Sequence, residues 1–243
     1  MRIRLDTRLV ATGLVDSREK AKRFILAGAV RVNGQLAHKP SDLVAEDAVL
    51  VLDAGEKYAS RGGYKLEAAL DTFHISCGGL VCADLGASTG GFTDCLMQRG
   101  ATRVHAVDVG KGQLAWKLRQ DPRVVVHDKI NARYLLPTDL GEQVDLVTID
   151  VSFISLTKVL PAAVAVLKPG GTIVALIKPQ FEAGKKLVKK GGVVRDSRVH
   201  EAVTTMIRQF LMETMGLRVL GIVESPLVGP AGNKEFLIVA HKP

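Results

Sequence analysis

Short apolar runs alternate with stretches of helical periodicity along most of the chain. Seven runs rich in β-branched residues occupy positions 80–84, 104–108, 124–127, 144–150, 172–177, 219–223 and 236–240. Between most of them apolar residues recur at helical spacing, as in 156–167 after an N-cap at Ser155 and in 198–215 after one at Asp196 or Ser197. Strands that alternate with helices predict a mostly parallel sheet. The last two runs are joined only by a loop and should pair antiparallel at one edge.

The first 57 residues show a different pattern. Apolar positions predict helices at 5–12 and 18–27, each followed by a glycine, Gly13 or Gly28. A strand at 29–32 leads into Asn33-Gly34, a strong signal for a type I′ hairpin turn, and a further strand is expected at 48–52. We therefore expect two domains: a small α+β domain at 1–57 and a larger α/β domain at 58–243.

Charge is unevenly distributed along the chain. Lys and Arg number 33 and Asp and Glu 25, for a net charge of +8. Residues 1–39 carry +6 and residues 184–198 carry +5, whereas residues 40–56 carry −5. Charge runs are often only solvated surface. Two separate basic clusters nevertheless favour a nucleic-acid partner, because a phosphate backbone is neutralised by several cations on one surface.

Composition argues against several classes of protein. The longest stretch without Lys, Arg, Asp or Glu has twelve residues, 72–83, whereas a membrane-spanning helix needs about 20. Residues 1–6 lack the apolar core of a signal peptide. Three cysteines without C-x-x-C spacing argue against a disulfide scaffold or a zinc ribbon and indicate a reducing cytoplasm. The six histidines show no metal-ligand spacing, so no metal site is expected.

The loop after the first strand of the larger domain, 84–94, is rich in glycine. Its spacing, G-x-x-x-G-G, differs from the G-x-G-x-x-G that holds a pyrophosphate in dinucleotide-binding proteins. S-adenosylmethionine has no phosphate and suits this loop better. Acids at the ends of three successive strands would contact its ammonium (Asp84), ribose (Asp108) and adenine (Asp128) in the crevice of the sheet. The predicted cofactor residues are Asp84, Gly86, Ala87, Ser88, Gly90, Gly91, Phe92, Asp108, Asp128, Asn131 and Asp150.

Four charged residues stand where an unpaired charge would be costly. Lys178 and Asp150 end apolar strands, Glu235 opens the last strand, and Lys65 enters the helix before the first. The chain lacks the Asn/Asp-Pro-Pro-aromatic motif of amine methyltransferases, and no cysteine lies at or beyond position 150, as methylation of pyrimidine C5 would require. The four residues are therefore either a catalytic set or two ion pairs at a sheet edge.

The set Lys65, Asp150, Lys178 and Glu235 resembles the Lys-Asp-Lys-Glu tetrad of FtsJ-like ribose 2′-O-methyltransferases. The resemblance implies a class I, Rossmann-like methyltransferase domain with a seven-stranded sheet. A ribose 2′-hydroxyl must lose its proton as it attacks the methyl group, and a lysine can be the base where burial and a neighbouring ammonium lower its pKa. We expect Lys178 to be this base, oriented by Asp150, with Lys65 as its neighbour and Glu235 holding Lys65 or the ribose.

The segments Arg4-Leu5-Asp6, 16–22 and 28–34 resemble the RNA-binding domain first named from the fourth protein of the small ribosomal subunit. Such domains place a basic helical face against structured RNA, here Arg4, Arg8, Arg18, Lys20, Lys22 and Arg23. The glycine-rich loop 184–195 follows Lys178 and is interpreted as a lid that grips RNA through Lys185, Lys186, Lys189, Lys190 and Arg195. A solvated helix face and a solvated loop are the alternatives.

Over its whole length the chain resembles the TlyA family, also called haemolysin A. The resemblance rests on the basic N-terminal domain and on Ser60-Arg-Gly-Gly-Tyr-Lys-Leu66, 84–94, 150–155, 178–182, 191–196 and 232–236. It implies 2′-O-methylation of cytidine in ribosomal RNA or ribosomal subunits, and the chain resembles the shorter members that modify only the large subunit. Where longer members have an Arg-x-Trp-Val linker, this chain has Glu56-Lys-Tyr-Ala59. Two alternatives are a membrane-active cytolysin, which no apolar span supports, and a non-catalytic ribosome-assembly factor.

Overall fold

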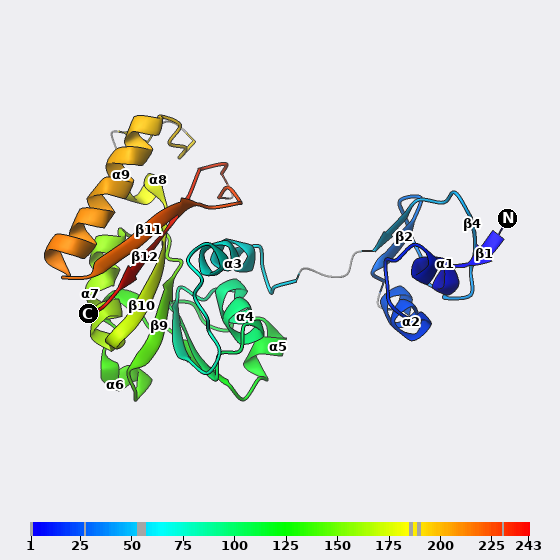
Figure 1. Ribbon diagram of the computed structural model, residues 1–243, viewed down its shortest axis with the longest axis horizontal. Helices are drawn as coiled ribbons and strands as arrows, with labels where there is room; N and C mark the ends of the chain where they lie inside the picture. The colour runs from blue at the N-terminus through cyan, green and yellow to red at the C-terminus, as the bar shows by residue number, and fades with distance from the viewer. Residues whose placement is uncertain (1, 27, 53–56, 185–186, 189–190, 230) are drawn as a thin grey trace. The chain divides into compact units, whose positions relative to one another are not determined.

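The computed structural model describes residues 2–26, 28–52, 57–184, 187–188, 191–229 and 231–243. Contacts divide the chain into two compact parts, a small unit at Met1–Lys57 and a large unit at Tyr58–Pro243 (Figure 1). The small unit has one hydrophobic core and the large unit has two. Each unit therefore has its own packing and is a separate body.

The small unit packs two short helices against short strands. Helices α1 (Leu5–Ala11) and α2 (Arg18–Leu26) bury an apolar face each. Strands β2 (Val30–Val32), β3 (Gln35–Leu36) and β5 (Leu50–Leu52) form one antiparallel sheet, and β1 (Arg2–Arg4) pairs with β4 (Leu43–Ala45). Asn33 and Gly34 have φ values of 50° and 82°, as the predicted type I′ turn requires. The β1–β4 pair was not predicted, because three residues are too few to show a strand period.

A buried carboxylate ties the two helices of the small unit together. Asp6 of α1 is fully buried and accepts hydrogen bonds from Nε and Nη2 of Arg4 at 3.1 and 3.0 Å and from Nη2 of Arg18 at 2.9 Å. The two guanidinium groups hold the pKa of the Asp6 carboxyl far below its usual range. Because Arg18 is the first residue of α2, this contact fixes the start of α2 against α1.

A seven-stranded sheet in the order β11-β12-β10-β9-β6-β7-β8 forms the large unit. Strands β6 (Val81–Leu85), β7 (Arg103–Asp108), β8 (Val124–Asp128), β9 (Val144–Ile149) and β10 (Leu167–Ile177) run parallel. Strand β12 (Phe236–His241) lies antiparallel between β10 and β11 (Arg218–Glu224). The predicted α/β fold, with its antiparallel pair at one edge, is confirmed.

Helices cover both faces of this sheet (Figure 1). On one face α3 (Gly62–Thr72), α4 (Gly91–Gln98) and α5 (Trp116–Arg119) pack on a core that includes Cys82. On the other, η1 (Ala132–Tyr134), α6 (Pro137–Leu140), α7 (Leu156–Val166) and α9 (Ser197–Gln209) pack on a core that includes Ala83. The side chains of neighbouring residues in one strand thus point into opposite cores, as the two-residue period of a strand requires.

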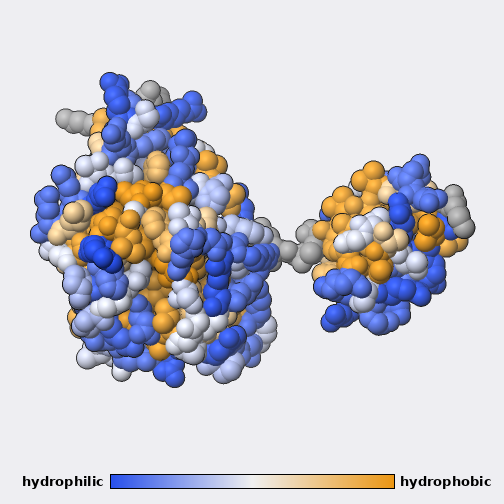
Figure 2. All heavy atoms as spheres, viewed as in Figure 1, coloured by the Kyte–Doolittle hydropathy of each residue, from blue (hydrophilic) through white to orange (hydrophobic). Residues whose placement is uncertain are grey.

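The long helices of the large unit start and end at recognisable signals. Oγ of Ser155 accepts from the backbone N–H of Thr157, and Asp196 caps α9 by accepting from Arg198 N–H at 3.0 Å. The stretch predicted as a single helix at 198–215 widens into a π-helical turn, Phe210–Thr214, at its end. Among the described residues no helix is both long enough and apolar enough to cross a membrane. Polar and apolar areas alternate over the visible surface of both units (Figure 2).

Replacing Asp6 by Asn should loosen the small unit. The change removes the charge that two arginines bind, and hydrogen bonds to charged groups are the stronger ones. We expect hydrogen exchange at the amides of α1 and α2, measured in the full chain, to become about tenfold faster. Asp16 pairs with Lys20 at 2.9 Å on the surface, so Asp16→Asn should change the same rates by less than about twofold. Equal effects of both variants would show that Asp6 does not anchor the helices.

Candidate active site

Two adjoining cavities lie at the carboxyl ends of the central strands of the large unit. The first, of about 300 Å³, is lined by residues from the start of α3, the loop after β6, the ends of β9 and β10, and the segment before β12; we call it the lysine cavity. The second, of about 580 Å³, extends toward the end of β7 and is called the β7-side cavity. Both are lined by Gly86, Ser88, Asp150 and Ser152, so a single elongated ligand can reach from one to the other.

Lys178 and Asp150 meet in the wall of the lysine cavity. They directly follow β10 and β9, which are parallel neighbours, so both side chains stand at the same edge of the sheet. Nζ of Lys178 lies 2.6 Å from Oδ1 of Asp150 and donates a hydrogen bond to Oγ of Ser152 at 2.8 Å. Only 11% of the Lys178 side chain and 23% of the Asp150 side chain are exposed. The lysine charge is therefore compensated locally rather than by water.

Lys65 and Glu235 form a second ion pair in the same wall. Lys65 lies in the first turns of α3, and Glu235 directly precedes β12. Nζ of Lys65 donates to Oε2 of Glu235 at 2.5 Å, and the two side chains are 10% and 1% exposed. All four predicted catalytic residues line the lysine cavity. The fold thus brings together four residues that are up to 170 positions apart in the sequence.

Glycines in the loop after β6 bring the backbone close to the cavity. Gly86 has a φ of +88°, and a Cβ there would lie 2.5 Å from the carbonyl oxygen of Asp150. Gly90 has a φ of +96° at the start of α4, and a Cβ there would lie 2.3 Å from Leu118. Conformation and space both require glycine at these positions. Of the predicted cofactor residues in this loop, those that line the lysine cavity are Gly86, Ala87, Ser88, Gly91 and Phe92.

Asp108 and Asn131 stand in the wall of the β7-side cavity. Oδ2 of Asp108 accepts from the backbone N–H of Ser88 at 2.8 Å, and Oδ1 accepts from that of Gly110 at 2.7 Å. Each carboxylate oxygen has a second lone pair, so Asp108 can also accept from the two hydroxyls of a ribose. The apolar side chains of Val109 and Ile130 line the same cavity. This wall therefore combines a carboxylate with apolar surface.

Asp84, which is predicted to contact the cofactor, does not line either cavity. It is fully buried and accepts hydrogen bonds from Oγ1 of Thr93 at 2.7 Å and of Thr148 at 3.1 Å. Burial raises the pKa of Asp84 to about 7. Its side chain thus secures α4 beneath the glycine loop. A position near the end of a strand does not by itself tell whether the side chain faces the crevice.

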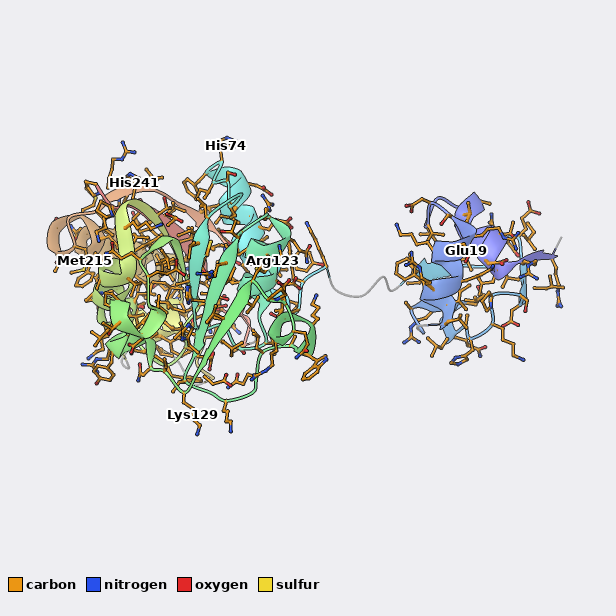
Figure 3. The ribbon with its side chains drawn as sticks, turned by 90° about the horizontal axis from the view of Figure 1, so that it is seen from below. Glu19, His74, Arg123, Lys129, Met215 and His241 are labelled. Atoms are coloured by element: carbon orange, nitrogen blue, oxygen red, sulfur yellow. The ribbon has the colours of Figure 1, made fainter. Side chains whose placement is uncertain are left out.

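Asp128, which is predicted to contact adenine, is also absent from the walls of the two cavities. Its Oδ2 accepts from the backbone N–H of Gly112 at 3.2 Å and from Arg119 at 3.4 Å. Asp128 therefore holds the loop after β7. The next residue, Lys129, projects outward from the large unit (Figure 3).

Sequence reasoning missed four polar residues of the lysine cavity and an aromatic pair beside it. Ser60, Arg61, Thr89 and Ser152 line the cavity. Phe153 is 91% exposed, and its ring centroid lies 5.0 Å from that of Phe181. With a φ of +63°, Phe153 is in a strained conformation, which is common at functional sites. Both phenylalanines lie in segments on which the family resemblance rests, 150–155 and 178–182, and these segments were the available signal for the pair.

The predicted RNA-binding residues have different surroundings. In the small unit, Arg4 and Arg18 bind Asp6, Lys20 pairs with Asp16, and Lys22 pairs at 2.8 Å with Glu19, which is labelled in Figure 3. Arg8 donates to the carbonyl oxygen of Glu46, and Arg23 is exposed. Arg195 is exposed before α9, whereas Lys185, Lys186, Lys189 and Lys190 lie outside the described residues. Neighbouring acids thus orient most of the basic side chains named in the small unit.

Comparison with known families gives two matches. The FtsJ-like methyltransferase family matches residues 58–242, and the S4 domain matches residues 3–50. The two matches fall in the large and the small unit, respectively.

Individual proteins resemble almost the whole chain. A protein of Mycobacterium tuberculosis named 16S/23S rRNA (cytidine-2′-O)-methyltransferase TlyA is 47% identical over 98% of this chain and 89% of its own length. A Brachyspira hyodysenteriae protein named Hemolysin A is 40% identical over 97% and 98%. A solved structure from Streptococcus thermophilus, also named as a hemolysin, is 44% identical, with a TM-score of 0.75 over 99% of this chain and 88% of its own.

The buried carboxyl of Asp84 should make stability fall as the pH rises through about 7. Its pKa in the folded chain is about 7, above the value of about 4 for an unfolded aspartate, so the stabilising proton is bound at low pH and lost at higher pH. Asp84→Asn cannot ionise and should remove this loss. Thermal unfolding should be measured for both proteins at about pH 6 and pH 8. The melting temperature of Asp84→Asn minus that of wild type should be larger at pH 8 than at pH 6. A constant difference at both pH values would contradict the raised pKa.

Proposed function

The chain belongs to the FtsJ-like methyltransferase family, and from that premise we propose that it methylates the ribose 2′-hydroxyl of cytidine in ribosomal RNA. The relative from Mycobacterium tuberculosis, which aligns with nearly the whole chain, is named for this reaction. The observation that carries the proposal is the meeting of Lys178–Asp150 and Lys65–Glu235 in one cavity. The large-subunit RNA is the first substrate to test and the small-subunit RNA the second.

The walls of the two cavities fit S-adenosylmethionine. A Cβ at Gly86 or Gly91 would collide with Asp150 or Ser60, so only glycine lets the loop pack this closely and present its backbone in the cavity wall, where the amino-acid part of the cofactor would lie. Asp108 would accept from the ribose hydroxyls, and Asn131 with its apolar neighbours would surround the adenine. When bound, S-adenosylmethionine supplies a methyl group that leaves a sulfonium as the ribose oxygen bonds to it.

Lys178 is the residue that we assign as base. In its neutral form, Nζ takes the proton of the 2′-hydroxyl and becomes an ammonium that Asp150, 2.6 Å away, stabilises. The proton then passes to water. The Lys65–Glu235 pair lines the same cavity and would hold the ribose. Holding the hydroxyl in line with the methyl group supplies much of the rate enhancement.

Further features support an RNA substrate. The S4 domain match covers most of the small unit, and residues 1–39 carry +6, which favours a polyanion. In the large unit, Phe153 and Phe181 border a third cavity of about 850 Å³ together with Arg133 and Lys158. Aromatic and cationic side chains around one cavity are typical of sites for unstacked RNA bases. We assign this third cavity to RNA.

Methyl transfer accounts for the site better than membrane lysis does. One relative is named Hemolysin A, but a pair of buried lysine–carboxylate contacts in a cavity has no part in opening a membrane. We place the reaction in the cytoplasm, where the thiols of Cys77, Cys82 and Cys95, all buried and free, stay reduced. The paired tetrad also favours an enzyme over a ribosome-assembly factor without catalysis.

Lys178→Ala should abolish most methyl transfer. Wild type should transfer labelled methyl groups from S-adenosylmethionine to ribosomal RNA or subunits, and loss of the base should slow this by about 10²–10⁴-fold. Binding of S-adenosylmethionine, measured by calorimetry, should change little. The control is Lys168→Ala, which removes a lysine paired with Asp145 at the opposite edge of the sheet and should keep full activity.

Nucleoside analysis of the product decides between the outcomes. The proposal predicts 2′-O-methylcytidine after digestion of the RNA. A wild type that transfers no methyl group to naked RNA or to either ribosomal subunit, or that methylates only bases, contradicts the proposed reaction. Full activity of Lys178→Ala contradicts only the choice of the base.

A further inference from the structure

We propose that Ser152 is a positioning residue that aims Nζ of Lys178 at the substrate hydroxyl. This inference rests on the proposed function, since it assigns Ser152 a part in that reaction. Ser152 lines both the lysine cavity and the β7-side cavity. Its hydroxyl therefore stands at the junction where a methyl donor and a ribose would meet.

The two contacts of Lys178 differ in kind. The contact with Asp150 is an ion pair in which Nζ lies 2.6 Å from Oδ1, a buried oxygen with no other polar partner among the described residues. The contact with Oγ of Ser152, at 2.8 Å, is a hydrogen bond with directional geometry. Asp150 thus supplies the compensating charge and one direction, and Ser152 supplies a second direction.

Direction matters for a lysine that accepts a proton. A neutral amine has two N–H groups and one lone pair in a tetrahedral arrangement. The contact with Asp150 alone, at 2.6 Å, leaves the lone pair two possible positions about the Cε–Nζ bond. A hydrogen bond to Ser152 fixes one N–H group, and with the carboxylate on a second side the lone pair faces the cavity.

The turn that carries Ser152 is held rigidly at both ends. At its start, the backbone N–H of Asp150 donates to the carbonyl oxygen of Leu85 at 2.9 Å. At its end, Glu182 accepts from Oγ of Ser155 at 2.6 Å and from the N–H of Leu156 at 2.8 Å. Glu182 lies on α8 (Pro179–Glu182), directly after Lys178. One segment therefore carries the lysine and also braces the turn that presents Ser152 to it.

Removing the hydroxyl of Ser152 leaves the charge of the site unchanged. The charged groups that face Lys178 in the lysine cavity are Asp150, Lys65, Glu235 and Arg61, with Asp84 buried behind Asp150. The hydroxyl accepts from Nζ, and such a hydrogen bond is stronger to an ammonium than to a neutral amine. Its loss should therefore make the neutral amine available at lower pH while the amine becomes less well aimed.

The test is single-turnover methyl transfer by Ser152→Ala and Ser152→Thr over a range of pH. For Ser152→Ala we expect methyl transfer to be about tenfold slower on the plateau of the profile of rate against pH. We also expect the acid limb of this profile to move to lower pH. Affinity for S-adenosylmethionine and for ribosomal RNA should stay within about twofold. Ser152→Thr keeps the hydroxyl and should restore both the plateau and the acid limb. The matched control is Ser76→Ala, because Ser76 is exposed and lines none of the three cavities described above.

Each outcome of this experiment either supports or overturns the positioning role of Ser152. A Ser152→Ala enzyme with an unchanged rate overturns the proposal. So does a reduced rate with an unmoved acid limb, since general loosening of the fold lowers the plateau without moving the limb. Failure of Ser152→Thr to restore the profile also overturns it. In all three cases wild-type transfer to RNA persists, whereas an inactive wild type refutes the proposed function itself.

Discussion

The large unit depends on one constraint: two lysine charges are largely buried at the edge of a sheet and must each have a carboxylate partner. The topology meets this requirement. Parallel strands β9 and β10 end side by side, which brings Asp150 to Lys178. Strand β12 runs antiparallel to β10 and therefore begins at the edge where β10 ends, which brings Glu235 to Lys65. The antiparallel strand β12 is thus part of the site and not only of the fold.

The same arrangement gives the site its chemical character. Both lysines are neutralised within hydrogen-bond distance, so the cavity can lie among apolar strands without an uncompensated charge. Glycines in the loop after β6 let its backbone pack closely against Asp150 and Ser60 beside these pairs. A lysine base, a cofactor wall and an opening for RNA can therefore share one crevice, which is the usual place for ligands in open α/β sheets.

The sequence predicts those features that depend on local pattern. Strand periods, the Asn33-Gly34 turn and the caps at Ser155 and Asp196 are local, and the structure confirms them. The tetrad could be recognised because a charge at the end of an apolar strand is conspicuous. The direction of a strand-end side chain is not local, since it depends on which neighbours fill the core. Asp84 and Asp128 are predicted to contact the cofactor, and in the structure they hold α4 and the loop after β7 and are absent from the walls of the two cavities. Ser152 lies in the segment 150–155, but no spacing in the sequence indicates its contact with Lys178.

The central claim is that the two lysine–carboxylate pairs act as one catalytic centre. A double-mutant cycle on the rate of methyl transfer, with Asp150→Asn and Glu235→Gln, tests it most directly. If the pairs act together, the double variant should be about as slow as the slower single variant, because either change alone already disables the unit. If the two losses multiply, the pairs act independently, and the account of a single catalytic centre is wrong.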